Sequence, residues 1–362
     1  MKTVLIVGAG PAGLATALAI RKQLPDLSIT VVERTQQRGF RPGETVPGRI
    51  LRLFEALHLK DSFLAQDHWP AYGRRILWEG NTDVPALLQT EGTGWHLNRP
   101  LFDEWLEEHC QARGIRVVRG FGKAHAVQKG DHWIVTGQSL AIKADFLINA
   151  TGSAAILADH RKSCEVKDQL VATYFFGEKI GEETYTTIAA AQNGWWYHCN
   201  LADRSVFTLV TDPEHVKTHA FKTAGDLHHE LPDDEAFRSA FATVPHHQEG
   251  QWFTVRVHQS AAYGEGWLAV GDALMKFDPL SGQGIYKAFE TALWCSYALK
   301  DYRNKKPMAM RKYQAIARTM FEAYEQQSAR YYGVMPESRG GFWERRRQNS
   351  IGRIQLAVSK KQ

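Results

Sequence analysis

The hydrophobic pattern changes its period early in the chain. Residues 4–7 (VLIV) are continuously apolar, which is typical of a buried strand. Residues 14–20 are rich in Leu and Ala, which favours a helix, and residues 28–33 (SITVVE) form a second apolar run that ends in an acidic side chain. The pattern predicts a strand–helix–strand unit over residues 1–33, with a glycine-rich turn after its first strand.

Further along, apolar residues recur at helical spacing in two segments and then alternate in short stretches. Residues 48–59 and 98–114 predict helices, the second with Asn98 as its N-cap. Residues 145–152 (DFLINATG) predict a buried strand that ends in a glycine turn. Residues 165–260 hold short alternating stretches, which indicate antiparallel strands around one helical insert.

After residue 260 the pattern returns to that of the first unit. GWLAVGDA (266–273) predicts a buried strand, and residues 282–331 predict helices interrupted at Pro307. We therefore expect an α/β fold: a Rossmann-type dinucleotide-binding domain, an inserted antiparallel-sheet substrate domain and C-terminal helices. The expected boundaries are 1–152 and 261–330 for the first domain, 153–260 for the β-rich domain and 331–362 for a basic C-terminal segment.

The glycine-rich turn has a spacing that suits a pyrophosphate. The first glycine (Gly8) makes the tight turn, Gly10 lets phosphate approach the backbone, and Gly13 lets the helix pack on the strand. The N–H groups at the helix start attract the anion. Glu33, twenty residues after Gly13, is expected to accept hydrogen bonds from an adenosine ribose. The alternative is an ordinary glycine turn with Glu33 merely exposed.

A second motif follows the last buried strand, in AVGDALMKFDPLSGQGIYKAFE (269–290). Asp272 lies just after the strand and can accept hydrogen bonds from a ribityl hydroxyl. Gly282 and Gly284 leave amide groups open at a helix start, where they can face a phosphate or a flavin carbonyl. The alternative is a capped helix after a buried strand.

Charge and cysteine content narrow the class of protein. The chain has 362 residues, a net charge of +5 and four widely spaced cysteines without a C-x-x-C pair, so no metal site or redox dithiol is expected. With no long apolar run and no signal-peptide pattern, we expect a cytoplasmic protein without a membrane span. Residues 339–362 hold seven Lys or Arg and one Glu, which suits either an acidic partner or a solvated tail. No nucleic-acid motif accompanies them.

Together, GAGPAG, VVER, NATG and GDA…PLSGQG resemble the flavoprotein monooxygenases of the para-hydroxybenzoate hydroxylase fold over residues 1–330. The resemblance implies FAD, with Asp272 on the ribityl chain, Arg99 near the pyrophosphate, and Pro279 and residues 282–285 beside the isoalloxazine. The expected cofactor-binding residues are Gly8, Gly10, Pro11, Ala12, Gly13, Glu33, Arg34, Arg41, Glu44, Arg99, Gly152, Gly271, Asp272, Pro279, Gly282, Gln283, Gly284 and Ile285.

The source of electrons stays open. No second dinucleotide motif is present, because the GTG at 92–94 has no strand–helix context. Many hydroxylases of this fold carry D-G-x-x-S-x-x-R after the central strand, and this chain has ATGSAAILA from Ala150, without the Asp or the Arg. NAD(P)H and an external reductant both remain candidates.

Two further segments resemble narrower branches. GETVP (43–47) and GWWYHCNL (194–201) resemble segments of the flavin-dependent tryptophan halogenases, but residues 68–80 lack the Lys that halogenation requires. With its length, the chain is most similar to the LodB-like flavoproteins. That implies hydroxylation of a tryptophan in the precursor of a quinone-cofactor amino-acid oxidase, through a flavin C4a-hydroperoxide formed with molecular oxygen, during cysteine tryptophylquinone maturation.

The chemistry requires a closed, apolar site more than a strong base. Trp195, Trp196, Tyr197 and Phe277 are expected to line it. Glu44 and His198 are candidate proton handlers, although both are equally suited to structural hydrogen bonds, so no catalytic residue is assigned. The alternatives are a small-molecule aromatic hydroxylase, a halogenase-like enzyme and a flavin-binding maturation chaperone.

Overall fold

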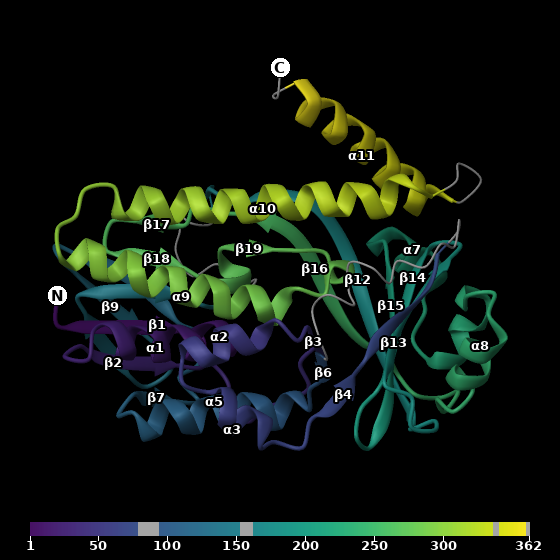
Figure 1. Ribbon diagram of the computed structural model, residues 1–362, viewed down its shortest axis with the longest axis horizontal. Helices are drawn as coiled ribbons and strands as arrows, with labels where there is room; N and C mark the ends of the chain where they lie inside the picture. Colours follow the sequence, from purple (N-terminus) through teal and green to yellow (C-terminus); the bar gives the residue numbers. More distant parts are fainter. Residues whose placement is uncertain (79–93, 153–161, 336–339, 360–362) are drawn as a thin grey trace.

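The structure is a computed structural model that describes residues 1–78, 94–152, 162–335 and 340–359, with side chains up to Ser350. Figure 1 shows a body with a parallel sheet and its helices at one end, and a large antiparallel sheet at the other. This arrangement confirms the predicted α/β fold with a Rossmann-type part, a β-rich part and C-terminal helices.

The first part is built on a six-stranded sheet. Its central strand β1 runs parallel to both neighbours, with Leu5 opposite Leu147 on one side and Thr30 on the other. In order across the sheet the strands are β17 (Tyr263–Gly264), β18 (Trp267–Ala269), β11 (Phe146–Asn149), β1 (Thr3–Val7), β2 (Ser28–Val32) and β7 (Arg116–Val118). Chain segments before and after the β-rich part therefore share one sheet.

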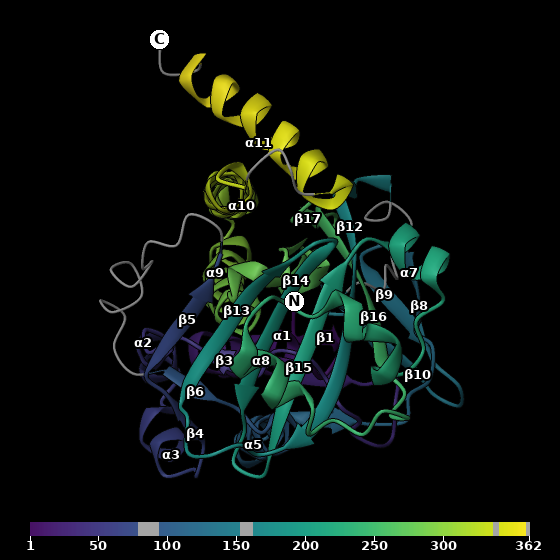
Figure 2. The ribbon, with the colours of Figure 1, turned by 90° about the vertical axis from the view of Figure 1, so that its right-hand side faces the viewer.

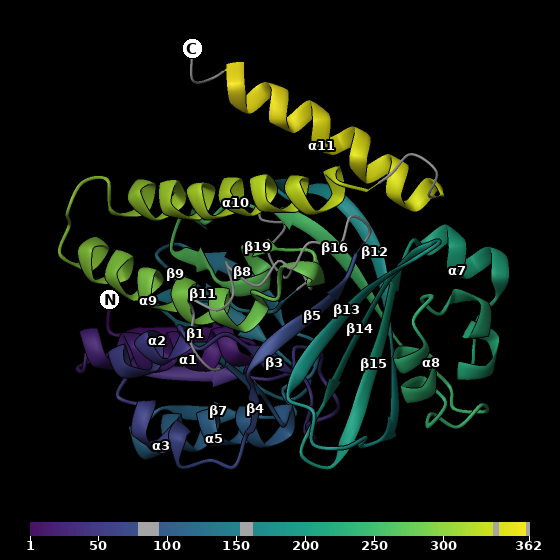
Figure 3. The same cartoon turned by 45° about the vertical axis from the view of Figure 1, so that its right-hand side comes forward.

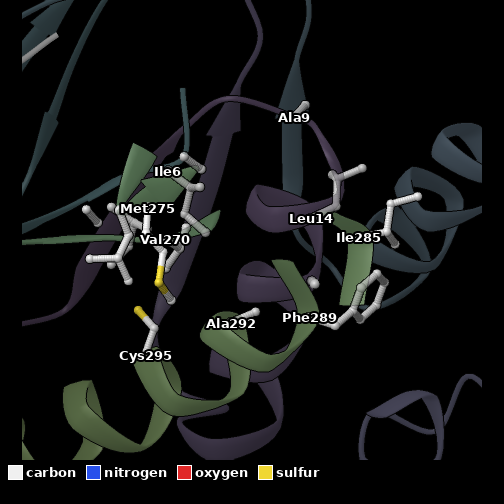
Figure 4. Packing of buried hydrophobic residues seen from close by; sticks show 14 of the residues in the cluster. Ile6, Ala9, Leu14, Val270, Met275, Ile285, Phe289, Ala292 and Cys295 are labelled. Carbon is white, nitrogen blue, oxygen red and sulfur yellow. The ribbon is translucent and has the colours of Figure 1, made fainter. Parts of the chain in front are cut away.

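Helices cover one face of this sheet and a small antiparallel sheet lies against the other. On the helical face, α1 (Pro11–Gln23) packs against both α5 (Arg99–Ala112) and α9 (Gly284–Arg303). On the other face lie β8 (His125–Lys129), β9 (His132–Thr136) and β10 (Ala141–Ala144). Figure 4 shows Phe289 and Ala292 of α9 among side chains from β1 and α1, so the last helices complete the first core.

The β-rich part is a seven-stranded sheet that takes strands from outside residues 153–260. In order its strands are β19 (Met275–Lys276), β16 (Gln251–Gln259), β12 (Glu165–Glu178), β15 (Arg204–Thr211), β14 (Gly194–Asn200), β13 (Tyr185–Ala191) and β5 (Gly73–Leu77). The edge strand β5 pairs in parallel with β13. Both edge strands of this sheet, β19 and β5, therefore come from chain segments outside the insert.

The two faces of this sheet carry different side chains because successive residues of a strand point to opposite sides. Trp195 belongs to the large core shared with the first part. Trp196 belongs to a second core, packed under α7 (Pro213–His219), a 3₁₀ turn over Ala224–Glu230 and α8 (Glu235–Phe241). Figure 3 shows α7 and α8 on the outer side of the sheet.

The remaining elements join the two parts. They are β3 (Thr45–Val46), α2 (Ile50–Ala56), α3 (Lys60–Leu64), β4 (Trp69–Ala71), β6 (Gly94–His96), the 3₁₀ turns Gly271–Ala273 and Pro279–Ser281, α10 (Ala309–Gly333) and α11 (Gly341–Ser359). Helix α10 lies along α9, and α11 leaves the body toward the C-terminus, as Figures 1 and 2 show. Among the described helices, none combines the length and apolar character needed to cross a bilayer.

Candidate functional site

The turn after β1 has no room for side chains at two of its glycines. Gly8 has a positive φ of 112°, and a Cβ there would lie 2.3 Å from the carbonyl oxygen of Ala150. A Cβ on Gly13 would lie 1.9 Å from the carbonyl oxygen of Gly8. These contacts bring the helix start, the turn and the end of β11 into direct backbone contact, which is the close packing that the sequence predicts.

The second glycine of the turn faces open space instead. The nearest atom to a Cβ on Gly10 would be Nη1 of Arg41, at 3.5 Å. Arg41 also pairs with Glu33, whose other oxygen accepts the N–H of Ala9 at 2.8 Å. Burial raises the pKa of Glu33, but the Ala9 N–H and the Arg41 charge outweigh it and hold that pKa below its ordinary value. The carboxylate of Glu33 and the guanidinium of Arg41 therefore lie near Gly10.

The second motif packs directly on the first. Gly271 has a positive φ of 57°, and a Cβ there would lie 2.5 Å from the Cβ of Ala12. Asp272 follows at once, with its side chain about one-third exposed (35%). Its Oδ1 accepts a hydrogen bond from Nζ of Lys287 at 2.8 Å, and Nζ of Lys276 lies 3.6 Å from Oδ2.

The loop before β3 meets two helix starts. A Cβ on Gly43 would lie 3.0 Å from Nη1 of Arg99 and 3.7 Å from Cδ1 of Ile285. Arg99 is 6% exposed, donates to the carbonyl oxygen of Pro42 and pairs with both oxygens of Asp103 at 3.2 Å. The structure therefore brings α5, α9 and the 41–44 loop together at one point.

The carboxyl group of Glu44, in the same loop, has few hydrogen-bond partners. The side chain is 4% exposed, and its Oε1 has no hydrogen-bond partner. Its Oε2 accepts only the N–H of Gly43, at 3.2 Å. Burial raises the pKa of Glu44, and the nearby Arg99 charge only partly opposes that shift. Glu44 is thus held toward its protonated form beside the predicted cofactor loop.

A chain of hydrogen bonds connects the loop to the inserted sheet. Thr45 Oγ1 lies 2.8 Å from Nδ1 of His96 and 2.6 Å from the hydroxyl of Tyr197. The Tyr197 hydroxyl in turn donates to Sγ of Cys199 at 3.1 Å. Burial lowers the pKa of His96 to about 4, so this ring is neutral at pH 7. In GWWYHCNL, Tyr197, Cys199 and Asn200 stand where the similar halogenase segment, G-W-x-W-x-I-P, has its second Trp and its Ile-Pro.

The predicted aromatic wall is divided between the two faces of the sheet. Trp195 and Tyr197 lie on the face toward the first part. Trp196 lies on the opposite face, where its indole N–H donates to the carbonyl oxygen of Glu230 at 2.6 Å. His198 also lies there, stacked on Phe207 with ring centroids 4.4 Å apart, because strand alternation turns it to the face opposite Tyr197.

The other predicted residues are distributed around these contacts. Arg34 has an exposed side chain, and Gly152 is a turn glycine with a φ of 64°. Gly282 lies against Arg74, while the amide of Gln283 donates to Gln327 of α10 at 2.8 Å. Pro11, Pro279 and Gly284 each stand at a helix start. The rest of ATGSAAILA after Gly152, and the first two residues of the GTG at 92–94, lie outside the described residues.

Two residues of the site carry no signal in the motifs. Lys287 lies in the first turn of α9, at a position that is buried to 1% exposure among apolar residues. His96 lies in a three-residue strand that local patterning does not predict. A lysine inside an otherwise apolar helical face is the one sequence feature that could have drawn attention to position 287.

The donor set fits FAD. The turn at Gly8 and Gly13 leaves only backbone N–H groups at the start of α1, and Gly10 is open to a pyrophosphate. Glu33 and Asp272 offer carboxylate oxygens to hydroxyl groups at two separate points, as an adenosine ribose and a ribityl chain require. The start of α9 and the 41–44 loop lie next to each other, which brings together segments that the sequence assigns to the cofactor.

Comparisons with known proteins agree with this chemistry. The tryptophan halogenase family model matches residues 3–72 and 71–358. The putative FAD-dependent oxidoreductase LodB of Marinomonas mediterranea is 26% identical over 360 residues, which cover 94% of this chain and 96% of that protein. A tryptophan 2-halogenase of Chondromyces crocatus is 25% identical over 325 residues, and the match covers 82% of this chain but 61% of that longer protein.

Solved structures share the fold. The flavin-dependent halogenase CmlS superposes with a TM-score of 0.83 and 19% identity, over 98% of this chain and 70% of that one. The peptidyl tryptophan dihydroxylase QhpG superposes with a TM-score of 0.75 and 24% identity, over 95% of this chain and 78% of that one. Because the family model covers almost the whole sequence, this chain belongs to the tryptophan halogenase family, and it is an FAD-dependent oxidoreductase.

Proposed function

We propose that the chain is a monooxygenase that hydroxylates a tryptophan side chain of a precursor protein, during cysteine tryptophylquinone maturation of an amino-acid oxidase. The observation that carries this proposal is the aromatic face of the inserted sheet, with Trp195 and Tyr197, turned toward the Gly43–Thr45 loop. The similarity to LodB along nearly its whole length supports the same reading, as does the shared fold with a peptidyl tryptophan dihydroxylase.

Different residues of the site have different roles in the proposed hydroxylation. FAD, when bound and reduced, supplies the electrons that activate molecular oxygen. Each turnover converts one ring C–H to C–OH and releases the second oxygen atom as water, with two electrons from NAD(P)H or an external reductant. The glycine turn and Asp272 hold the cofactor, and the aromatic face excludes water and orients the indole. Glu44 Oε1, which has no partner, is placed to hold or release a proton.

Halogenation is the second candidate, because the family model is that of the tryptophan halogenases. Residues 68–80 contain no Lys. Lys60 begins helix α3 on the surface, with its Nζ 3.7 Å from Glu55, and its side chain is 39% exposed. We therefore expect no halogenated product from this chain.

Oxygen transfer tests the proposal directly. FAD-loaded protein is reduced chemically and mixed with ¹⁸O₂, bromide, and either a quinone-cofactor oxidase precursor or free tryptophan. We expect ¹⁸O in a tryptophan of the precursor, at a rate at least about tenfold above that of free tryptophan, because most of the binding energy comes from the protein surface. Mass spectrometry of the products measures both.

Three outcomes would overturn it. Equal turnover of free tryptophan or a small phenol would indicate a small-molecule hydroxylase. A brominated indole would indicate a halogenase. Precursor binding without any oxygen transfer would indicate a flavin-binding maturation chaperone.

A further inference from the structure

Lys287 is the most completely buried cation near the predicted cofactor site. It lies one turn into α9, three residues after Gly284, and is 1% exposed. Its Nζ donates to Oδ1 of Asp272 at 2.8 Å and to the carbonyl oxygen of Met275 at 2.6 Å. The ammonium also lies 4.6 Å from the ring centroid of Phe277. All three of these partners come from the 271–277 segment.

The same helix holds the turn at a second point. The backbone N–H of Gly271 donates to Oγ1 of Thr291 at 3.0 Å, and Thr291 lies one helical turn after Lys287. Helix α9 therefore fixes the Gly271–Asp272 turn through two adjacent side chains on one face. Asp272 keeps about one-third of its side chain exposed while its inner oxygen is bound.

Stability alone gives little reason for a lysine at this position. Taking an ammonium out of water is costly, and a buried ion pair can often be replaced by apolar residues without loss of stability. An apolar side chain at 287 could fill the same space among Phe277 and Met275. It could not hold a negative charge at Asp272. A function that requires the negative charge of Asp272 therefore explains the lysine better than stability does.

We propose that Lys287 is a positioning residue for FAD, because its buried ammonium holds the Asp272 carboxylate ionised and in place, with the outer face of that carboxylate left to the ribityl hydroxyls. The inference rests on the FAD part of the proposed function and not on the identity of the substrate.

The charges around Asp272 support this role. Three groups face the carboxylate: Lys287 from α9, Lys276 from β19 and His258 from β16. Burial raises the pKa of Asp272, but the charges of Lys287 and then Lys276 outweigh burial, with a smaller contribution from His258, and lower that pKa to about 2. Lys276 is the weaker partner because it is farther away, at 3.6 Å, and its side chain is 20% exposed. Removing Lys287 takes away the largest interaction that opposes burial and leaves only Lys276 and His258, so the pKa of Asp272 should rise.

The test measures FAD affinity by fluorescence quenching, between about pH 5 and pH 8, for the full chain and its Lys287→Met and Lys276→Met variants. Lys287→Met is expected to weaken FAD binding by about tenfold or more, since a hydrogen bond to a charged group contributes roughly 1.5–3 kcal/mol. The loss should grow as the pH falls. The wild-type protein and the matched control Lys276→Met should show little dependence on pH.

A double-mutant cycle with Asp272→Asn separates positioning from packing. The double variant should bind FAD no more weakly than Asp272→Asn alone, because Lys287 acts through the carboxylate. The double variant removes both charges of the pair, so neither stays buried without a partner. It can therefore be measured even if Lys287→Met does not fold. Wild-type affinity in Lys287→Met, or losses that multiply in the double variant, would overturn the inference. If the wild-type chain itself bound no FAD, the proposed function would fail instead.

Discussion

At the scale of single residues, two buried ionisable groups lie side by side near the 41–44 loop. Arg99 keeps its charge paired with Asp103 and also bonds the Pro42 carbonyl, although its Nε has no partner. Glu44, beside it, has an oxygen without a partner and a raised pKa. A buried polar atom without a partner costs free energy, so its retention favours a role in the bound state. Glu44 is the first residue to examine for proton transfer.

Glu44 also makes a prediction about pH. The folded chain holds the Glu44 proton more tightly than the unfolded chain, whose carboxyl titrates near 4.5, so this group lowers stability as pH rises from 4.5 through its raised value. Glu44→Gln imitates the protonated form and should remove that loss. Urea unfolding of the flavin-free protein should show a gain of about 1 kcal/mol at neutral to alkaline pH and none in acid. An equal effect at all pH values would contradict this.

The hydroxyl of Tyr197 makes a second prediction. Its bond to Thr45 ties the inserted sheet to the cofactor loop. Tyr197→Phe and Thr45→Val should each lower the free energy of unfolding by about 1 kcal/mol or more, because each removes the shared bond and one bond of its own, to Cys199 or to His96. The loss in the double variant should be smaller than the sum of the two single losses, because the shared bond is counted in both. Tyr185→Phe is the control, since Tyr185 is 51% exposed. Additive losses would show that the bond contributes nothing.

At the scale of elements, the C-terminal helix is part of the body at its start. The sequence predicts that residues 331–362 form a basic segment outside the core. In the structure Trp343 is 1% exposed, and its indole donates to the carbonyl oxygen of Ala191 at 2.8 Å. Arg346 is 5% exposed and bonds two carboxylates of the β-rich part, Asp168 in β12 and Asp212 at the N-cap of α7. The number of basic residues does not predict this contact, because the sequence does not show which arginines form ion pairs with buried carboxylates.

Two neighbouring arginines test that attachment. Both Arg345 and Arg346 bond Asp212, but the Arg345 side chain is 58% exposed and that of Arg346 5%. Arg346→Met should destabilise the protein by about 3 kcal/mol, because it removes the buried partner that Asp168 and Asp212 share and leaves Asp212 with only the more exposed Arg345. Arg345→Met should cost no more than about 1 kcal/mol. Equal losses in urea unfolding would show that burial does not distinguish the pair.

At the scale of the whole molecule, the sequence predicted the features that depend on residues close together in the chain. The 1–33 unit, the Asn98 cap and the break at Pro307 follow from residues close in sequence, and the structure has all three. The pairing of β5 with β13, the separation of Trp195 from Trp196, and the Lys287–Asp272 pair depend on contacts between distant segments or on which side of a sheet is covered. A pattern of hydrophobic positions does not contain that information.

The last prediction concerns docking of a protein substrate. Helix α11 carries Trp343 and Arg346 in its buried first half and then leaves the body, as Figure 2 shows. A chain that ends at Ser338 should therefore lose stability, since it lacks the Trp343 contact, and a large-to-small change in a core costs about 3–5 kcal/mol. A chain that ends at Ser350 keeps those contacts but lacks Arg353, Lys360 and Lys361.

The chain that ends at Ser350 tests only the contribution of the basic end to partner binding. A chain ending at Ser350 should keep its FAD affinity and thermal midpoint, but it should bind an oxidase precursor more weakly, and its binding should depend less on salt. Exposed charges are screened over about 8 Å at physiological ionic strength, so the lost attraction should be largest at low salt. Calorimetric titration at two ionic strengths measures this. Unchanged precursor affinity at low salt would remove the basic end from the docking surface and leave the aromatic face of the inserted sheet as the determinant.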